Sequence, residues 1–353
     1  MKFKRRITAI CASALALGAT FLLYPQFTDK QTHSPLPTPT PALVQNTPTN
    51  TPVPTKAPTA TPEPTKPPLF TAEFQTPDET VSGLVTSYIT AYYGNDFDTL
   101  SALVSDATVL NPVTIENNTE GVKKVEDITL YEKPGLNEVD SVIYATYTLS
   151  YGSSRVGTPQ FSEYHLVTTE DGSLKVNTST LSAETLSVLA EARTREDVLM
   201  LSVTSLIKRY NNACLNGDEP LLRQCVTDAS YLDMDYFASR FAYTENFSDY
   251  EFTFRPGINE FDYLVYVTYK EKIVLIDTAA PCMECFCISI NPSAQPLIYF
   301  GITSLDTDAY CAAVNQSDEI QAIAVKTNQA MEDALLEDDD LKEFYNHLVG
   351  SNG

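Results

Sequence analysis

Apolar residues follow a helical spacing where the polar N-terminal part of the chain gives way to mixed sequence. Between Thr80 and Tyr93 the apolar side chains form one stripe, and the break at 94–96 (Gly-Asn-Asp) separates it from a short second pattern at 97–104. We therefore expect two helices, the second shorter than the first.

Alternation with a period of two replaces the helical spacing further along the chain. It covers 141–151, 162–169 and 174–180. Asp171 and Gly172 between the last two segments are typical of a hairpin turn. A curved antiparallel sheet is expected to follow the two helices.

The same series of residues occurs twice. When the chain is compared with itself at a shift of 122 residues, no gap is needed over the helical region, and a two-residue shift is expected near the end of each copy, where Leu181 matches Leu305. The matched pairs include Val85 with Ile207, Tyr88 with Tyr210, Ala91 with Ala213, Asp96 with Asp218, Leu100 with Leu222 and Val104 with Val226. Two copies of one domain are indicated.

Each copy carries a basic residue followed by Pro and Gly just before its longest alternating segment. The first copy has Lys133-Pro-Gly and the second Arg255-Pro-Gly. Pro fixes φ and Gly permits positive φ, so the motif predicts a type II turn with a structural role.

A third helical pattern extends from Asp318 to Leu348, and no third alternating region accompanies it. We expect a packed helical cap over residues 314–353. Ser317 or Asp318 is expected to cap its N-terminus, with Gln321 completing a capping box. The acidic run 337–340 lacks the ligand spacing of a calcium loop and is expected to be a solvated helix face.

These features resemble the tandem nuclear transport factor 2-like domains of uncharacterised surface proteins of Gram-positive bacteria. The resemblance rests on 133–140 with Tyr144, on 255–262 with Tyr266, and on the helix of 325–344. It implies an α+β fold in which helices are wrapped by a strongly bent antiparallel sheet, with one such domain at 71–190 and another at 191–313. The superfamily includes isomerases, dehydratases and domains that only bind, so fold alone does not decide function.

The N-terminus has the order of an export signal. Basic residues within 1–6 precede an apolar run at 7–24, which is at about the lower length limit of a membrane-spanning helix. A retained single-pass anchor is the favoured interpretation, and secretion after signal cleavage is the alternative.

Pro and Thr make up more than half of 31–70, so 25–70 is interpreted as a disordered linker. Both interpretations of the N-terminus place the remainder outside the cell, and the anchored form would lie on the surface of a Gram-positive bacterium.

The net charge of the chain limits the kinds of partner that it is expected to bind. The formal net charge is −23, and almost all of the acidic residues follow residue 70. Phosphate recognition needs clustered Lys and Arg, so nucleic acid is not expected as a partner. Membrane contact is expected only through the N-terminal helix, and the partner is expected to be an extracellular ligand or protein.

Candidate ligand contacts are tyrosines on faces that the patterns direct inward. They are Tyr88, Tyr92, Tyr147, Tyr210 and Tyr269, for which core packing is the competing interpretation. The superfamily's isomerases combine a carboxylate with Tyr and a protonated acid, and its dehydratases use His and Asp. Alternation directs Glu163 and His165 away from the pocket, and no carboxylate is placed opposite Tyr147. No catalytic residue is therefore assigned.

Six of the seven cysteines follow residue 213. Cys282, Cys285 and Cys287 form C-x-x-C-x-C, but alternation puts Cys282 on the face opposite to the other two and a fourth ligand is not evident, so no metal and no cofactor is expected. Cys214, Cys225 and Cys311 are further disulfide candidates, and free buried thiols are equally consistent with the sequence.

Two hypotheses of function remain. The favoured one is a non-catalytic surface module, tethered to the membrane, that binds a ligand or a protein. The alternative is an extracytoplasmic isomerase- or dehydratase-like enzyme that uses the pocket of the cone. A buried Asp or Glu with a raised pKa facing Tyr147 or Tyr269 would favour the enzyme.

Overall fold

The computed structural model describes residues 74–152, 154–259 and 261–350. The predicted basic segment 1–6, anchor 7–24 and linker 25–70 lie outside the described residues. Among the residues that are described, no helix combines the length and the apolar character needed to cross a membrane.

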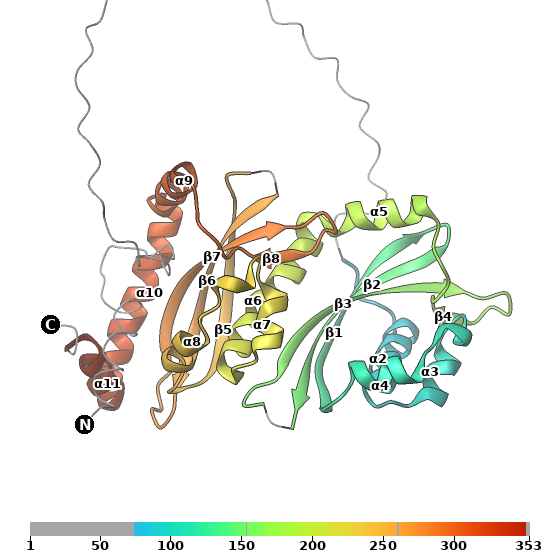
Figure 1. Cartoon of the computed structure of the whole chain (residues 1–353), viewed down its shortest axis with the longest axis horizontal. Helices are drawn as coiled ribbons and strands as arrows, with labels where there is room; N and C mark the ends of the chain where they lie inside the picture. Colours follow the sequence, from blue (N-terminus) through green and yellow to red (C-terminus); the bar gives the residue numbers. More distant parts are fainter. Residues whose placement is uncertain (1–73, 153, 260, 351–353) are drawn as a thin grey trace, which may run out of the picture. The chain divides into compact units, whose positions relative to one another are not determined.

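The first repeat, as we call the elements α2 to α5, is a four-stranded antiparallel sheet with helices before and after it (Figure 1). The strands are hydrogen-bonded in the order β1-β2-β3-β4. The elements are α2 (Glu79–Tyr93), α3 (Phe97–Leu103), the 3₁₀ turn η2 (Ala107–Val109), α4 (Pro112–Asn118), β1 (Val122–Leu136), β2 (Val139–Tyr151), β3 (Thr158–Thr168), β4 (Leu174–Val176) and α5 (Ala183–Arg193).

The second repeat, α6 to α9, has the same series of elements and the strand order β5-β6-β7-β8. Ser182 caps α5 and Ser304 caps α9, so the shift of 122 residues continues to the end of the repeat and the predicted two-residue shift is wrong. The elements are α6 (Glu196–Asn216), α7 (Glu219–Cys225), η3 (Ala229–Tyr231), α8 (Met234–Arg240), β5 (Thr244–Pro256), β6 (Asp262–Ile273), β7 (Ala280–Ile290), β8 (Pro296–Ile298) and α9 (Leu305–Asn315).

Aspartates matched between the repeats start equivalent helices. Asp96 accepts a hydrogen bond from the Thr99 amide at 3.0 Å and begins α3, and Asp218 accepts one from the Leu221 amide at 3.0 Å and begins α7. Each satisfies a backbone N–H that has no partner inside its helix. The short second helix predicted at 97–104 is confirmed.

Strands β1 and β5 are absent from the prediction because a bulge breaks their alternation. The pairing of β1 with β2 shifts between Glu126 and Thr129, and Asp127 there has a φ of 56°. Asp249 has a φ of 52° at the equivalent shift in β5. A bulge moves the following side chains to the other face, so a search for period two finds no continuous strand.

The Pro-Gly motif closes a hairpin, but not by the predicted positive φ. Neither Gly135 nor Gly257 is among the residues with positive φ. A Cβ on Gly135 would lie 1.9 Å from the Val139 carbonyl oxygen, and one on Gly257 would lie 2.5 Å from the Asp262 Cβ. Glycine is needed because two strands approach too closely for a side chain.

Both faces of each sheet are covered. The inner face of the first sheet packs Ile143, Ala145 and Tyr147 against α2, as the alternation predicts. The outer face is also buried, with Val142 and Tyr144 packed against residues of α5 and α6. Each sheet therefore belongs to a three-layer arrangement of helix, sheet and helix.

Helix α6 belongs to both repeats. Its N-terminal Val198 packs in the outer-face cluster of the first sheet, whereas Ile207 and Tyr210 on its C-terminal half pack in the inner core of the second. At its end, Asn216 accepts a hydrogen bond from the Val156 amide at 3.2 Å. Asp338 accepts the equivalent bond from the Thr278 amide at 2.9 Å.

Helices α10 (Asp318–Glu337) and α11 (Asp339–Gly350) repeat the start of the series. Ile320 is buried against the outer face of the second sheet, as Val198 is against the first. Gln321 donates to the Asn315 carbonyl at 2.7 Å, so the predicted capping box does not form. The acidic run is not one helix face, because Asp338 separates the two helices and accepts from the Leu341 amide at 2.9 Å.

The basic residue of the Pro-Gly motif joins each sheet to the helix that covers it. The Lys133 ammonium is fully buried and lies 2.5 Å from an Asp197 carboxylate oxygen in the first turn of α6. Arg255 pairs in the same way with Glu319 in the first turn of α10, where both side chains are more exposed. The motif thus has the structural role that was predicted, through a cross-element ion pair.

We expect Asp197→Asn to lower the free energy of unfolding by about 3 kcal/mol, because it removes the carboxylate that faces a buried ammonium. Glu319→Gln is the matched control, and its more exposed pair should cost less than about 1 kcal/mol. Urea denaturation of the two variants measures both values, and equal losses would contradict the assignment.

A second substitution tests the close approach at the hairpin. Gly135→Ala places a methyl group against the Val139 carbonyl and should destabilise the chain by more than about 2 kcal/mol. Gly83→Ala on the exposed face of α2 meets no atom within 4 Å and should stabilise by up to about 1 kcal/mol. Thermal unfolding compares the two, and a tolerated Gly135→Ala would refute the steric explanation.

Candidate functional site

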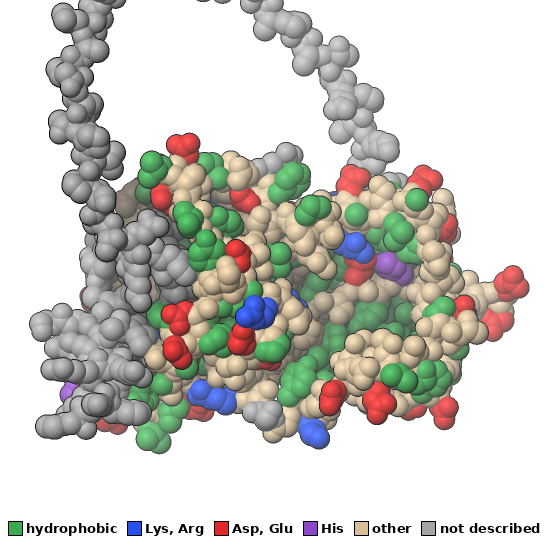
Figure 2. Space-filling model, viewed as in Figure 1, with side chains coloured by type: hydrophobic (Ala, Val, Ile, Leu, Met, Phe, Trp, Pro, Cys, Tyr) green, Lys and Arg blue, Asp and Glu red, His purple; other side chains and the backbone are tan. Residues whose placement is uncertain are grey.

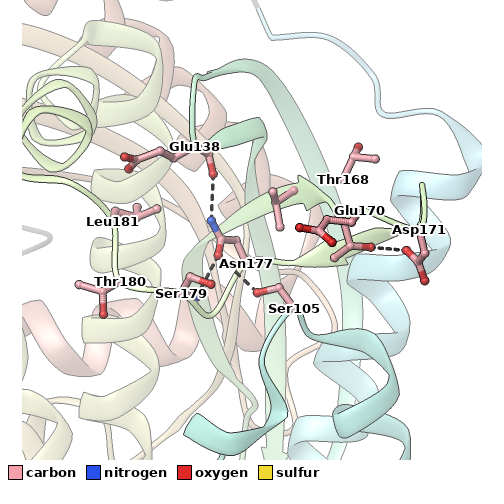
Figure 3. A pocket seen from close by; sticks show the side chains of 11 residues that line it. Ser105, Glu138, Thr168, Glu170, Asp171, Asn177, Ser179, Thr180 and Leu181 are labelled. Carbon is pink, nitrogen blue, oxygen red and sulfur yellow. Dashed lines mark hydrogen bonds between the residues drawn. The ribbon is translucent and has the colours of Figure 1, made fainter.

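A shallow surface pocket of about 820 Å³ lies beside the β3–β4 hairpin of the first repeat (Figure 3). Its polar groups bond mainly to one another. Asn177 donates to the Glu138 carbonyl at 3.0 Å, and Ser105 donates to the Asn177 side-chain oxygen at 3.4 Å. Thr169 and Ser173 both donate to Asp171, which lowers the pKa of that carboxyl. Because these groups satisfy each other, the pocket offers little to a ligand.

The first repeat brings three of the predicted tyrosines into one aromatic cluster. Tyr88 and Tyr92 stack with ring centres 6.2 Å apart, and Tyr93 lies between Tyr92 and Tyr147. The Tyr147 hydroxyl is 3.0 Å from that of Tyr93 and 2.9 Å from the Ser162 hydroxyl. The partners of the Tyr147 hydroxyl in these two bonds are both hydroxyl groups.

Tyr210 and Tyr269 lie in the core of the second repeat. Tyr210 packs on Phe237, Phe286 and Phe300 with ring centres 6.0 to 6.2 Å apart. Tyr269 packs at 5.7 Å from Tyr250. Both predicted residues are buried, and the environment of Tyr269 differs from that of Tyr147 because ionisable groups surround it.

Glu284 on β7 is the ionisable group beside Tyr269. It lies deep among protein atoms, yet part of its surface remains reachable by solvent. Burial raises the pKa of the Glu284 carboxyl, and repulsion from Glu271 adds to the rise. Attraction to Arg240 and a hydrogen bond with Tyr269 oppose it without cancelling it. A raised pKa makes protonation of this carboxyl easier, and a protonated carboxyl can donate a hydrogen bond as well as accept one.

A buried ion pair lies beside Glu284. Arg240 at the end of α8 donates to both carboxylate oxygens of Glu271, at 2.9 and 3.0 Å, and the Thr244 hydroxyl donates to Glu271 at 2.5 Å. Although burial alone would raise the pKa of Glu271, Arg240 and these hydrogen bonds lower it. Arg240 gives both terminal nitrogens to Glu271, so the pKa values of the two carboxyls shift in opposite directions for a physical reason.

Two further polar side chains complete the cluster. Cys282 on β7 donates to Glu271 at 3.8 Å, and burial raises the pKa of its thiol. Asn211 on α6 donates to the Tyr250 hydroxyl at 3.2 Å. We call Glu284, Tyr269, Arg240, Glu271, Thr244, Cys282, Tyr250 and Asn211 the interior polar cluster.

The first repeat folds without such a cluster. At the positions equivalent to Glu284, Glu271 and Arg240 it has Ser162, Leu149 and Asn118. Sheet order and helix order are the same in both repeats. The architecture therefore does not require buried charge at these positions, which makes the interior polar cluster the candidate site.

The alternation of β6 and β7 already predicts that Glu271 and Glu284 face inward, although neither residue was selected as a candidate. Phe286 and Ile288 were assigned inward by alternation, and the same phase two residues earlier reaches Glu284. Glu271 follows Tyr269 in the inward phase of β6 in the same way. Arg240 could not be found by this route, because its position depends on a helix that the pattern did not predict.

The cysteines occupy the two faces that alternation assigned. Cys282 faces the interior polar cluster, and Cys285 and Cys287 lie in the outer-face cluster with Cys311. All six cysteines after residue 213 are free thiols in the structure. Over the described ranges, His, Cys, Asp and Glu form no group of three able to hold a metal ion.

No protein-family model matches the sequence, and no curated protein matches it. Among solved structures, an "Ntf2 like protein involved in plasmid conjugation" is similar over 61% of this chain and 92% of its own, with 8% sequence identity and a TM-score of 0.23. Similarity at this level establishes no family. The mixed α+β architecture with bent antiparallel sheets stands on the elements described above.

The shifted pKa of Glu284 predicts how stability depends on pH. A folded-state pKa above the unfolded one means that the folded chain holds the proton more tightly, so stability is lost as pH rises through that interval. We expect Glu284→Gln to raise the melting temperature at pH 7 and to change it little near pH 4.

Glu271→Gln is the opposite control. It removes the partner of the buried Arg240 and should cost about 3 kcal/mol at pH 7. Because the pKa of Glu271 is lowered, the stability that it contributes is present above the unfolded pKa and is lost as pH falls. Melting curves from pH 4 to 8 test both variants, and a destabilising Glu284→Gln at pH 7 would show that Glu284 is a structural charge.

Proposed function

We propose that this chain is an exported, membrane-tethered protein whose second repeat binds a small uncharged organic ligand against Glu284 and Tyr269. The observation that carries the proposal is the interior polar cluster, which the second repeat has and the first lacks. Two tandem nuclear transport factor 2-like domains, closed by the helices α10 and α11, are part of the same proposal. The N-terminal charge and apolar pattern support the tether.

The chemistry of the cluster favours a ligand with a carbonyl or hydroxyl group. When it is protonated, the Glu284 carboxyl can donate to the same ligand oxygen as the Tyr269 hydroxyl, and Glu271 is already paired with Arg240. Apolar and aromatic side chains surround these groups, so an apolar skeleton would be buried with its polar group paired.

Charge argues against an anionic ligand. The chain has a formal net charge of −23, and acidic side chains are spread over the face shown in Figure 2, where basic ones are few. Glu271 and Glu284 also add negative potential near the proposed binding position. An uncharged molecule meets no such repulsion on approach or in the bound state.

A second candidate is catalysis by proton transfer, the isomerase- or dehydratase-like alternative. Glu284 is the specific observation in its favour, because a carboxyl with a raised pKa beside Tyr269 is the feature that separates enzyme from binding module. Such a group can accept or donate a proton near neutral pH. The same residue would serve both functions, so the two candidates differ in what happens after binding.

Thermal shift with the full-length chain in detergent tests binding. A panel of uncharged sterols, lactones, phenols and oligosaccharides should include a compound that raises the melting temperature, by an amount equivalent to about 2.7 kcal/mol at a concentration of 100 times Kd. Glu284→Gln and Tyr269→Phe should remove most of that shift. Ser162→Ala at the equivalent position of the first repeat should leave it unchanged.

A panel without any shift, or a shift that survives both substitutions, would contradict the proposed site. For a compound that binds, exchange of its carbon-bound hydrogens in D₂O distinguishes the candidates. Exchange catalysed by the unsubstituted chain identifies an enzyme, and binding without exchange identifies a binding protein.

A further inference from the structure

Three thiols gather on the outer face of the second sheet, away from the interior polar cluster. Cys285 and Cys287 project from β7, and Cys311 on the covering helix α9 packs into the same cluster. Cys311 is 4% exposed, whereas Cys287 retains partial exposure. Tyr266 on β6 lies in this cluster with them. Three thiols thus connect a strand to the helix over it.

The first repeat joins the equivalent strand and helix by charge. Arg193 near the end of α5 donates to both Glu163 oxygens, at 3.0 and 2.9 Å, and His165 is 2.6 Å from Glu163. In the second repeat Cys285, Cys287 and Asn315 stand where the first has Glu163, His165 and Arg193, and Cys311 stands where it has Leu189. Asn315 accepts from the Tyr266 hydroxyl at 2.5 Å.

Cys287 and Cys311 lie in the same cluster and interact through their thiols. A hydrogen bond between the two thiols lowers the pKa of Cys311 and raises that of Cys287. The pair therefore loses its first proton more easily than an isolated buried thiol, and a thiolate is the species that attacks a disulfide. Cys285 differs from them in its partner, because its thiol is hydrogen-bonded with Tyr266.

We propose that Cys287 and Cys311 form a disulfide that fastens α9 to β7, in place of the ion pair that joins α5 to β3 in the first repeat. The oxidant is an external disulfide of a small thiol or of a thiol-disulfide exchange protein. One thiolate of the pair attacks that disulfide and releases one external thiol. The second attacks the mixed disulfide and releases the other, so two external thiols carry away the two protons and two electrons.

The occurrence of this bond in the living cell rests on the proposed export, because disulfides persist in oxidising compartments. Formation of the bond in the purified, folded chain does not depend on export. The oxidant is supplied in the test below, so the result is independent of both the membrane tether and the ligand at Glu284.

Peptide mapping of the full-length chain tests the pairing. The reduced, folded chain is incubated with oxidised glutathione, its remaining thiols are blocked with N-ethylmaleimide in denaturant, and chymotrypsin is added. Cleavage after Phe286 and Tyr310 separates Cys285, Cys287 and Cys311 into different peptides. Mass spectrometry should find the peptides of Cys287 and Cys311 joined, with Cys285 blocked by N-ethylmaleimide.

The matched variants are Cys285→Ser, which should keep the bond, and Cys287→Ser, which should abolish it. Oxidation should raise the melting temperature of the unsubstituted chain and of Cys285→Ser by roughly 5–10 °C, and should not raise that of Cys287→Ser. Blocked thiols at both Cys287 and Cys311, or a main product that joins Cys285 to Cys311, would overturn the proposal. So would the same mixture of products from folded and urea-unfolded chain, and this comparison needs no variant.

Discussion

The fold depends on one helix, α6, that packs against both sheets. The first turns of α6 cover the outer face of the first sheet and present Asp197 to the buried Lys133, and its last turns fill the inner face of the second sheet with Ile207 and Tyr210. A change in the length or phase of α6 would misplace one of the two contacts. This explains why the elements recur at a constant shift of 122 residues, and why α10 is required to cover the second sheet as α6 covers the first.

Sequence reasoning found the elements whose pattern is local. The stripe at 80–93, the short helix after Asp96, the Asp171-Gly172 hairpin and the duplication are all visible as periodicity or as matched residues. It failed where contacts between distant segments determine the local structure. The bulges at Asp127 and Asp249 shift the alternation of β1 and β5, and Gly135 is needed because a carbonyl of the neighbouring strand approaches it. Of the five candidate tyrosines, Tyr147, Tyr210 and Tyr269 are buried and the other two are half-buried. The groups that give Tyr269 a distinct chemistry come from β6, β7 and α8.

Duplication supplies an internal comparison that a single domain lacks. The interiors of the two repeats have the same architecture but different chemistry. The first contains tyrosine hydroxyls and apolar side chains, and the second contains Arg240, Glu271 and Glu284. Burying charge costs free energy unless it is paired, and Glu284 shares its surroundings with a carboxylate that already has the arginine. The outer faces differ as well, with an ion pair under α5 and thiols under α9. The second repeat therefore carries both of the features that fold alone does not explain.

The central claim is that burial beside Tyr269 in the second repeat raises the pKa of the Glu284 carboxyl, whereas Arg240 lowers that of Glu271. Carbon-13 NMR of the labelled glutamate carboxyls, with Glu284 identified by the loss of its signal in Glu284→Gln, measures its titration directly in the folded chain. We predict a midpoint clearly above the ordinary glutamate value of about 4.3, with Glu271 titrating below it. A Glu284 midpoint at or below that value would contradict the account, because the carboxyl would then be an ordinary charge at neutral pH.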